Sequence, residues 1–289
     1  FEDKNVGSNK VVTANSITLA DGTNGGLATN YSISTGQTTT ANIIAKTLTA
    51  TASASNKTYD GLTTATTTLT FSGLIGSETL DQTVLSTFNN KNVGTAKTVT
   101  VNSIALADGT NGGLAGNYSI SPGQTTTANI TAKSLTVSGI TASSKIYDGS
   151  TSATLTGTAV YSGLVTGDTF GGTYTGVFSD ANVGTGKTVN ITPSYSGADV
   201  NNYSVTDQST TTANITTKAL TATASASDKT YDGGTTASTT LTFTGLVGSE
   251  TLGQTVGSTF DNKNVGSNKT YNATNSASVT LTLSGLVGS

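Results

Sequence analysis

No cysteine, histidine, methionine, tryptophan or arginine occurs among the 289 residues of the chain. Without cysteine there are no disulfides and no thiolate nucleophile, and without histidine there is no imidazole base. The absence of both residue types also removes the usual protein ligands of zinc. Because all 13 basic residues are lysines that form no basic stripe, nucleic acid is not an expected partner.

Charge and long apolar runs are also scarce. Charged residues make up 10% of the chain, the net charge is −3, and no apolar run approaches the length of a membrane-spanning helix. Two carboxylates can serve a glycosidase, but the chain has only three glutamates, and its carboxylates recur at turns throughout. A catalytic site has no reason to be copied several times, so we expect no enzyme. We also expect no cofactor, with bound calcium as an open alternative.

Threonine, glycine and asparagine dominate what is present. Threonine accounts for roughly a fifth of the residues, and it favours strands, as do valine, isoleucine and tyrosine. The 34 glycines, together with asparagine and aspartate, supply turns. No segment shows the periodicity of an amphipathic helix. The composition therefore predicts an all-β fold.

Four short motifs recur in a fixed order. Tyr-Asp-Gly begins at Tyr59, Tyr147 and Tyr231, and Asn-Val-Gly begins at Asn5, Asn92, Asn182 and Asn264. Asn-Tyr-Ser begins at Asn30, Asn117 and Asn202, and Thr-Thr-Thr-Ala-Asn-Ile begins at Thr38, Thr125 and Thr210. The period is about 85 residues, the size of a small sandwich domain. The chain therefore divides into repeat 1 (1–46, the C-terminal part of a unit), repeat 2 (47–133), repeat 3 (134–218) and repeat 4 (219–289).

Repeat 4 is irregular. Its segment from Lys269 aligns without gaps on the segment from Lys229, although Lys269 also occupies the position that Lys97 occupies after its own Asn-Val-Gly. Either the unit was shortened by recombination at its C-terminal end, or a new unit begins early. The chain also begins inside a repeat, at Phe1, which fits both an arbitrary boundary and a polymer in which half-units complete one another.

Alternating apolar residues predict six or seven short strands in each repeat. In repeat 2 the alternation runs through Val99 and Val101 and resumes at Ile104 and Leu106, an offset that predicts a β-bulge. Asn111-Gly112 is a favoured two-residue hairpin turn. So many strands in about 85 residues indicate an immunoglobulin-like antiparallel β-sandwich.

Successive repeats follow one another with almost no linker. Lys46, Lys133 and Lys218 mark the joints, and the last strand of one repeat runs within a few residues into the first strand of the next. Connections this short restrict bending. We therefore expect a tandem array of sandwiches that forms a stiff, elongated rod, in which neighbouring repeats are one another's partners.

The ordered motifs resemble those of a known family. Lys-x-Tyr-Asp-Gly, Asn-Val-Gly with a following lysine, Asn-Tyr-Ser and Thr-Thr-Thr-Ala-Asn-Ile together resemble the YDG/MBG-type repeats of large bacterial surface proteins, such as filamentous-haemagglutinin-like and other giant adhesins. The resemblance covers essentially the whole chain. It implies a secreted or cell-surface location in a bacterium and an extended stalk, and it identifies no ligand.

The Tyr-Asp-Gly motif is typical of a buried tyrosine ring followed by a turn. Its aspartate could instead contribute to a calcium or ligand site. The loops that precede Asn30 and Asn117 are also rich in oxygen ligands, although one carboxylate per loop is few for calcium, and a hairpin turn explains these loops as well. The calcium candidates are Asp21, Asp60, Asp108, Asp148 and Asp232.

Recurring lysines and asparagines suggest a second hypothesis, an intramolecular Lys–Asn isopeptide crosslink of the kind found in some cell-surface stalks. Such a bond needs a buried lysine, an asparagine side chain and a nearby carboxylic acid. Lys57 with Asp60, together with Asn92 or Asn117, supplies these residue types. An exposed lysine is the alternative.

These features predict a non-catalytic extracellular stalk or spacer segment of a bacterial surface adhesin, which projects a distal binding region and supports attachment or biofilm formation. Two alternatives stay open. Weak sites for host or matrix glycan or protein, one in each repeat, would gain strength by avidity. Alternatively, threonine-rich edge strands could pair between molecules and build an extracellular filament.

Overall fold

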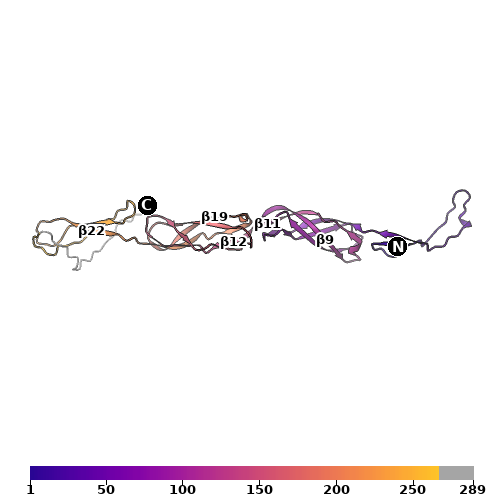
Figure 1. Ribbon diagram of the computed structural model, residues 1–289, viewed down its shortest axis with the longest axis horizontal. Helices are drawn as coiled ribbons and strands as arrows, with labels where there is room; N and C mark the ends of the chain where they lie inside the picture. The colour runs from indigo at the N-terminus through magenta and orange to yellow at the C-terminus, as the bar shows by residue number, and fades with distance from the viewer. Residues whose placement is uncertain (267–289) are drawn as a thin grey trace. The chain divides into compact units, whose positions relative to one another are not determined.

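A computed structural model describes residues 1–266 of the protein (Figure 1). Lys269, on which the two interpretations of repeat 4 depend, lies outside these residues. The described chain divides into two compact bodies. Body 1 comprises Phe1–Leu135, Ser162–Gly171 and Ser196–Thr206, and body 2 comprises Thr136–Tyr161, Gly172–Tyr195 and the described chain from Asp207 onward. Within residues 1–266, no helix is long and apolar enough to cross a membrane.

Repeats 1 and 2 are built from strands, with one short 3₁₀ helix in each. Repeat 1 contains an antiparallel pair, β1 (Gly7–Thr13) and β2 (Thr38–Ile43), with the 3₁₀ helix η1 (Ala28–Asn30) between them. The elements of repeat 2 are β3 (Lys46–Thr47), β4 (Thr49–Ala54), β5 (Lys57–Thr58), β6 (Thr64–Ala65), β7 (Thr67–Ser72), β8 (Leu80–Phe88), β9 (Gly94–Asp108), η2 (Ala115–Asn117), β10 (Tyr118–Ser119) and β11 (Thr125–Thr131).

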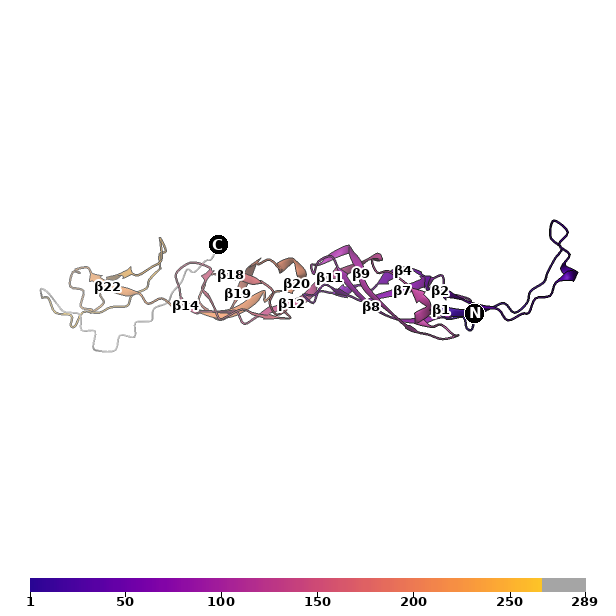
Figure 2. The same cartoon turned by 45° about the vertical axis from the view of Figure 1, so that its right-hand side comes forward.

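Repeat 2 arranges these strands as a five-stranded sheet and two smaller pairs. The large sheet has the order β5-β11-β9-β8-β6, β4 pairs with β7, and β10 pairs with β3. Figure 2 labels β4, β7, β8, β9 and β11 together in body 1. Most pairs are antiparallel, but β3–β10 and β5–β11 are short parallel pairs. Alternation in the sequence gives no sign of these parallel pairs, because it reports which face a residue takes and not the direction of the neighbouring strand.

Repeat 3 follows the same plan. Its elements are β12 (Lys133–Ser138), β13 (Thr141–Ala142), β14 (Lys145–Ile146), β15 (Ser152–Ala153), β16 (Leu155–Thr156), β17 (Val160–Ser162), β18 (Gly171–Phe178), β19 (Gly184–Ser196), η3 (Val200–Asn202), β20 (Tyr203–Thr206) and β21 (Thr210–Thr216). The large sheet has the order β14-β21-β19-β18-β15, which matches the large sheet of repeat 2 strand for strand. The described part of repeat 4 contains the antiparallel pair β22 (Thr221–Ala226) and β23 (Thr239–Thr244).

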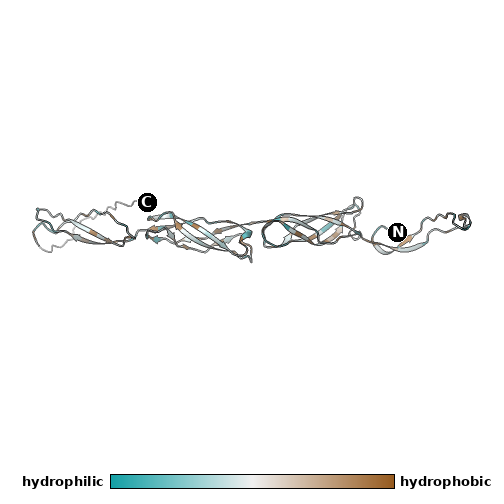
Figure 3. Cartoon of the chain, turned by 90° about the horizontal axis from the view of Figure 1, so that it is seen from above, coloured by the Kyte–Doolittle hydropathy of each residue, from teal (hydrophilic) through white to brown (hydrophobic). Residues whose placement is uncertain are grey.

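Each intact repeat has a thin apolar core of its own. In repeat 2 the core is formed by buried side chains from β7, β8, β9 and β11, namely Leu69, Phe88, Val99, Val101 and Ile130. In repeat 3 it is formed by Phe178, Val189, Ala213 and Ile215, with Tyr147 and Leu155 packed against them. Hydrophobic residues occur as short segments between neutral and hydrophilic ones along the strands (Figure 3). The predicted all-β array of sandwich-like repeats is confirmed.

Two local predictions in β9 and its following loop can be compared with the structure. The register between β8 and β9 passes from Leu85↔Ser103 to Ser86↔Val101, so Asn102 is the extra residue of the predicted bulge. Asn111 and Gly112 both have positive φ, 54° and 84°, as the predicted turn requires. This turn leads into η2 rather than into a paired strand, so it reverses the chain without forming a hairpin.

A second irregularity lies at the start of β9, where Ala96 has a φ of 48°. The corresponding positions are Asn9 in repeat 1 and Gly186 in repeat 3, residue types that tolerate the left-handed region. In all three repeats this residue donates its backbone N–H to an asparagine side chain, which for Ala96 is Asn129 at 2.8 Å. The loop therefore imposes a positive φ at this position, and Ala96 is strained because its Cβ disfavours that backbone conformation.

Replacing Ala96 with glycine is expected to stabilise the protein by about 0.5–1 kcal/mol, because the relief of left-handed strain exceeds the added entropy of the unfolded chain. Chemical denaturation of the A96G variant measures this gain. The control is Ala105→Gly within β9, where the same substitution should destabilise by about 0.5–1 kcal/mol. Equal effects of the two substitutions would contradict the assignment of strain to Ala96.

Candidate functional site

Side chains of two repeats meet at the joint between repeats 2 and 3, which lies inside body 1. Asp168, in the loop between β17 and β18 of repeat 3, has a side chain that is only 3% exposed. Its carboxylate accepts hydrogen bonds from Lys91 Nζ at 2.8 Å and Tyr59 OH at 2.8 Å, both in repeat 2. It also accepts one from Tyr203 OH, at 2.6 Å, in its own repeat. A single buried carboxylate therefore ties two repeats together.

Lys91 also bonds to a second carboxylate of repeat 3. Its Nζ lies 2.9 Å from Asp199 Oδ1, and it stands over the ring of Tyr59 at 5.8 Å from the centroid. Asp199 is fixed in turn, because its Oδ2 accepts the backbone N–H of Thr169 at 2.9 Å. The ammonium is thus held by two anchored carboxylates and an aromatic face, an arrangement that satisfies its charge at the edge of a buried interface.

Asparagine side chains complete the joint. Asn202, at the end of η3 and itself 3% exposed, accepts the backbone N–H of Val93 at 3.0 Å. Its Nδ2 donates to Asn92 Oδ1 at 3.3 Å. The Asn-Val-Gly loop of repeat 2 therefore docks on the Asn-Tyr-Ser segment of repeat 3 through both a backbone and a side-chain hydrogen bond.

The electrostatics of the joint favour its charged form. Burial alone would raise the pKa of the Asp168 carboxyl, but hydrogen bonds from Lys91, Tyr203 and Tyr59 outweigh burial and hold this pKa below its ordinary value. Hydrogen bonds to Asp168 and Asp199 raise the pKa of Lys91. Burial first, and the bond to Asp168 second, raise the pKa of Tyr203 to about 12. At neutral pH the joint therefore contains carboxylates, an ammonium and neutral phenols.

The joint between repeats 1 and 2, also in body 1, uses the same positions. Glu78 takes the place of Asp168: its carboxylate lies 3.1 Å from Lys4 Nζ and accepts a hydrogen bond from Tyr118 OH. Asn117 takes the place of Asn202 and accepts the backbone N–H of Val6 at 2.9 Å. One pattern of lysine, acid, tyrosine and asparagine therefore serves both joints.

The joint between repeats 3 and 4 lies in body 2 and keeps part of this pattern. Tyr147 donates its hydroxyl to the carboxylate of Glu250, as Tyr59 does to Asp168. A Cβ on Gly149 would lie 3.0 Å from Val247 Cγ1, so the turn of one repeat packs closely on the acidic loop of the next. The lysine is missing, because Ala181 precedes Asn-Val-Gly in repeat 3.

Comparison with known families accounts for this recurrence. The model of the YDG domain matches residues 44–128, 131–213 and 216–286. The chain belongs to the YDG domain family. Its matched segments begin a few residues before the boundaries that the motifs predict. No curated protein and no solved structure matches the chain.

The three residues that give the YDG domain its name have distinct structural roles. In repeat 2, Tyr59 reaches across the joint to Asp168. Asp60 stays within its own turn, where its Oδ1 lies 2.7 Å from Lys57 Nζ and accepts the backbone N–H of Leu62 at 2.9 Å. Gly61 has a φ of 80° and faces Val165 of the next repeat. The aspartate therefore stabilises the turn, whereas the tyrosine and the glycine contact the neighbouring repeat.

Replacing Gly61 with alanine is expected to destabilise the joint by about 1–3 kcal/mol. The alanine would have to keep the positive φ of Gly61, which is unfavourable for a residue with a Cβ, and its Cβ would lie only 2.9 Å from Val165 Cγ1. Hydrogen exchange at body 1 amides measures the loss. Gly123→Ala is the matched control, since its φ is also positive, at 112°, but its Cβ would meet nothing within 4 Å. Adding Val165→Ala to G61A is expected to restore part of the lost stability. If G123A lost as much stability as G61A, the contact between the added Cβ and Val165 would be excluded as the cause.

The five calcium candidates lie in separate turns. Asp60, Asp148 and Asp232 each pair with the lysine three residues earlier, and Lys145 holds the pKa of Asp148 down to about 2. Asp21 and Asp108 accept the backbone N–H at the start of η1 and η2. Among residues 1–266, no three acidic side chains are grouped as a metal site would need. In the structure these carboxylates hold turns through protein hydrogen-bond donors.

The predicted isopeptide residues are brought together only in part. Lys57 contacts Asp60, and its remaining hydrogen bonds go to the backbone oxygens of Leu62 and Thr64, so its three N–H donors are all used. Asn92 and Asn117 instead face the neighbouring repeats. Elsewhere in repeat 2, Lys97 Nζ donates to Asn90 Oδ1 at 2.6 Å. Motif spacing did not show that Lys57 lies apart from Asn92 and Asn117, because position in the sequence does not report which loops are adjacent.

Sequence reasoning missed the residues that carry the joint, namely Lys91, Asp168, Asp199 and Tyr203. A signal was present in the repeats. Lysine precedes Asn-Val-Gly in repeats 1, 2 and 4, and an acidic residue follows the Ser-Gly-Leu or Thr-Gly-Leu turn in repeats 2, 3 and 4. Because the two signals lie in different repeats, only the structure shows that they pair.

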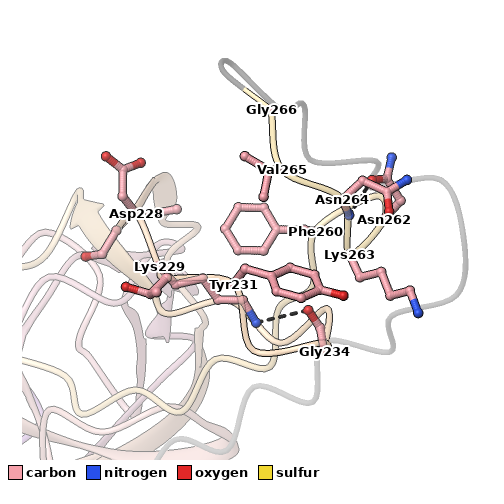
Figure 4. A pocket seen from close by; sticks show the side chains of 13 residues that line it. Asp228, Lys229, Tyr231, Gly234, Phe260, Asn262, Lys263, Asn264, Val265 and Gly266 are labelled. Atoms are coloured by element: carbon pink, nitrogen blue, oxygen red, sulfur yellow. Dashed lines mark hydrogen bonds between the residues drawn. The ribbon is translucent and has the colours of Figure 1, made fainter.

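Repeat 4 presents the same turn around a hollow of about 800 Å³ (Figure 4). Tyr231, the tyrosine of its Tyr-Asp-Gly motif, is 58% exposed, whereas Tyr59 is 1% exposed. The turn nevertheless keeps its internal bonds: Lys229 Nζ lies 2.8 Å from Asp232 Oδ1 and 3.1 Å from Gly234 O. These bonds therefore belong to the turn itself and do not depend on burial of the tyrosine.

Proposed function

We propose that the chain is a non-catalytic stalk or spacer segment of an extracellular bacterial adhesin. The observation that carries the proposal is the joint between repeats 2 and 3, where Asp168 is buried among side chains of both repeats. Consecutive repeats meet through a packed, hydrogen-bonded interface instead of a free linker. Such interfaces resist bending, so each added repeat extends reach.

The recurrence of the joint also supports a mechanical role over a catalytic one. Lys4–Glu78 and Lys91–Asp168 repeat the same chemistry, and each ionic group is used by its partner across the joint. These ion pairs therefore hold consecutive repeats together. A spacer can use one arrangement at successive joints, whereas an enzyme would need one site with its own acid and base.

Small-angle X-ray scattering on the chain, with and without calcium, tests the spacer. A single compact globule of this length should have a radius of gyration near about 19 Å. Repeats arranged end to end should give about 35–40 Å at strand-length dimensions. A large value that calcium leaves unchanged supports the proposal. A compact value would exclude it and would favour the alternatives, in which the repeats bind glycan or protein or pair with other copies.

The adhesin role and the bacterial surface location rest on the resemblance of the motifs to repeats of large surface proteins. Antibodies raised against the chain test the location directly on intact cells of its source. Labelling of intact cells, or recovery of the protein from the medium, is the expected result. Labelling only after the cells are broken would contradict an extracellular role.

A further inference from the structure

An early strand of each intact repeat pairs with its last strand in the parallel direction. In repeat 2, β5 runs parallel to β11, with Thr58 opposite Thr131. In repeat 3, β14 runs parallel to β21, with Ile146 opposite Thr216. We call β5–β11 and β14–β21 the terminal pairs. The first lies within body 1 and the second within body 2, so each is complete inside one body.

Hydrogen bonds beside the paired residues strengthen the terminal pair of repeat 2. Tyr59, directly after β5, donates its backbone N–H to Thr131 O at 2.9 Å. Thr131 Oγ1 donates in turn to Lys57 O at 3.3 Å. Just before β5, Asn56 Oδ1 accepts the backbone N–H of Asn129 at 2.7 Å. Bonds on both sides of the short pair therefore extend its contact.

Repeat 3 has the same bonds at the equivalent positions. Tyr147 donates its backbone N–H to Thr216 O at 2.8 Å, and Thr216 Oγ1 donates to Lys145 O at 3.3 Å. Ser144 Oγ takes the place of the asparagine and accepts the backbone N–H of Asn214 at 3.0 Å. The terminal pair is therefore a recurring unit of both intact repeats.

The direction of the terminal pair determines how it responds to tension along the chain. Tension draws β5 toward its N-terminal end and β11 toward its C-terminal end. In a parallel pair these two ends lie at opposite ends of the pair, so the strands must slide past each other and their hydrogen bonds share the load. In an antiparallel pair both pulled ends would lie together, and the bonds would break one after another. Ile130 of β11 and Ile215 of β21 are each 1% exposed, so the last strand is also held in the core.

We infer that the terminal pairs are the load-bearing elements of the intact repeats, so that the chain resists tension as well as providing reach. The inference deepens the proposed spacer function and rests on it for its biological purpose. Its test is separate, because the force that a single chain withstands and the radius of gyration are independent measurements. A compact chain would exclude the spacer, whereas a terminal pair that does not control unfolding under force would exclude only the load-bearing role.

Stretching single full-length chains by their two ends at constant force tests the inference. Each intact repeat should unfold in a step that lengthens the chain by roughly 250 Å, the reach of its extended residues less the length of the folded repeat. Thr131→Val removes the Oγ1 hydrogen bond of the terminal pair in repeat 2 and keeps the shape of the side chain. It should raise the unfolding rate of one such step about 2–10-fold, because the lost bond belongs to the element that breaks first. The step of repeat 3 should keep its rate.

Thr87→Val is the matched control in β8. Thr87 Oγ1 accepts a hydrogen bond from Asn102 Nδ2 at 2.9 Å within the large sheet, so the same substitution again removes one side-chain hydrogen bond. This bond should still be intact when the terminal pair breaks, so the unfolding rate under force should equal that of the parent chain. Urea denaturation checks that both variants are folded. An unchanged rate in T131V, or an equal rise in T87V, would overturn the inference.

Discussion

Replacing Tyr59 with alanine is expected to lower the free energy of unfolding by about 3–5 kcal/mol, the range for removing a large buried aromatic side chain. The ring is 1% exposed and packs edge-to-face on Tyr203, with centroids 5.6 Å apart. Its hydroxyl also donates to the buried carboxylate of Asp168. The substitution therefore opens a cavity and removes one of the three donors on which that charge depends.

Urea denaturation measures the total loss for Y59A, and hydrogen exchange locates it, because tandem repeats can unfold in separate steps. Protection should fall at body 1 amides of repeats 2 and 3. Tyr59→Phe removes only the hydroxyl and should cost about 1–2 kcal/mol. Tyr231→Ala is the matched control at an exposed tyrosine of the same motif, with an expected change of about 0.5 kcal/mol or less. If Y59A and Y231A lost similar amounts of stability, the contacts of Tyr59 at the joint would not be the cause of the loss in Y59A.

The Asp168→Asn variant is expected to cost about 2–3 kcal/mol, because an uncharged amide replaces an acceptor of three hydrogen bonds from charged or phenolic donors. The amide keeps the shape of the side chain, so the loss reports charge and hydrogen bonding more than packing. Asp81→Asn is the control at an exposed aspartate in β8, with an expected change of about 0.5 kcal/mol or less. Thermal unfolding of both variants at neutral pH provides the comparison.

The stability conferred by Asp168 should also depend on pH. Its pKa is lowered in the folded state, so its contribution is fully present above its unfolded pKa, about 3.9, and is lost as the pH falls through the lower folded value. Tyr203 acts in the opposite direction: its pKa is raised to about 12, so its contribution is present below about pH 10 and is lost as the pH rises toward about 12.

Melting temperatures of the parent chain and D168N measured across the pH range separate these effects. The difference between the two proteins should be constant from about pH 6 to 9 and should shrink below about pH 4, where the parent carboxylate becomes protonated. A difference that stays the same down to about pH 2.5 would contradict the role of the charged carboxylate.

The sequence was sufficient for the parts of the fold that are local in the chain. Alternation placed Val99 and Val101 in the core, the offset before Ile104 revealed the bulge at Asn102, and Asn111-Gly112 marked a turn with positive φ. Each of these features depends on neighbours a few residues away. For such features, side-chain alternation and backbone preference carry the information directly.

The sequence was not sufficient for the site, because the site joins residues from different repeats. Tyr59 and Asp168 are 109 residues apart, as are Val93 and Asn202. Tyr59 was correctly assigned to a buried ring and a turn, but its motif gave no indication of the acid that it would meet. The lysine–asparagine hypothesis failed to pair Lys57 with Asn92 or Asn117 for the same reason, since recurrence identifies important positions without showing which of them touch.

The distribution of the joint over two repeats has a consequence for how such proteins can change in length. A repeat such as repeat 2 carries both halves of a joint: Tyr59 and Lys91 face the repeat that follows, and Glu78 and Asn117 face the repeat that precedes. Such a head-to-tail interface does not close on itself. Duplication of one repeat within a gene would therefore create a compatible joint at once.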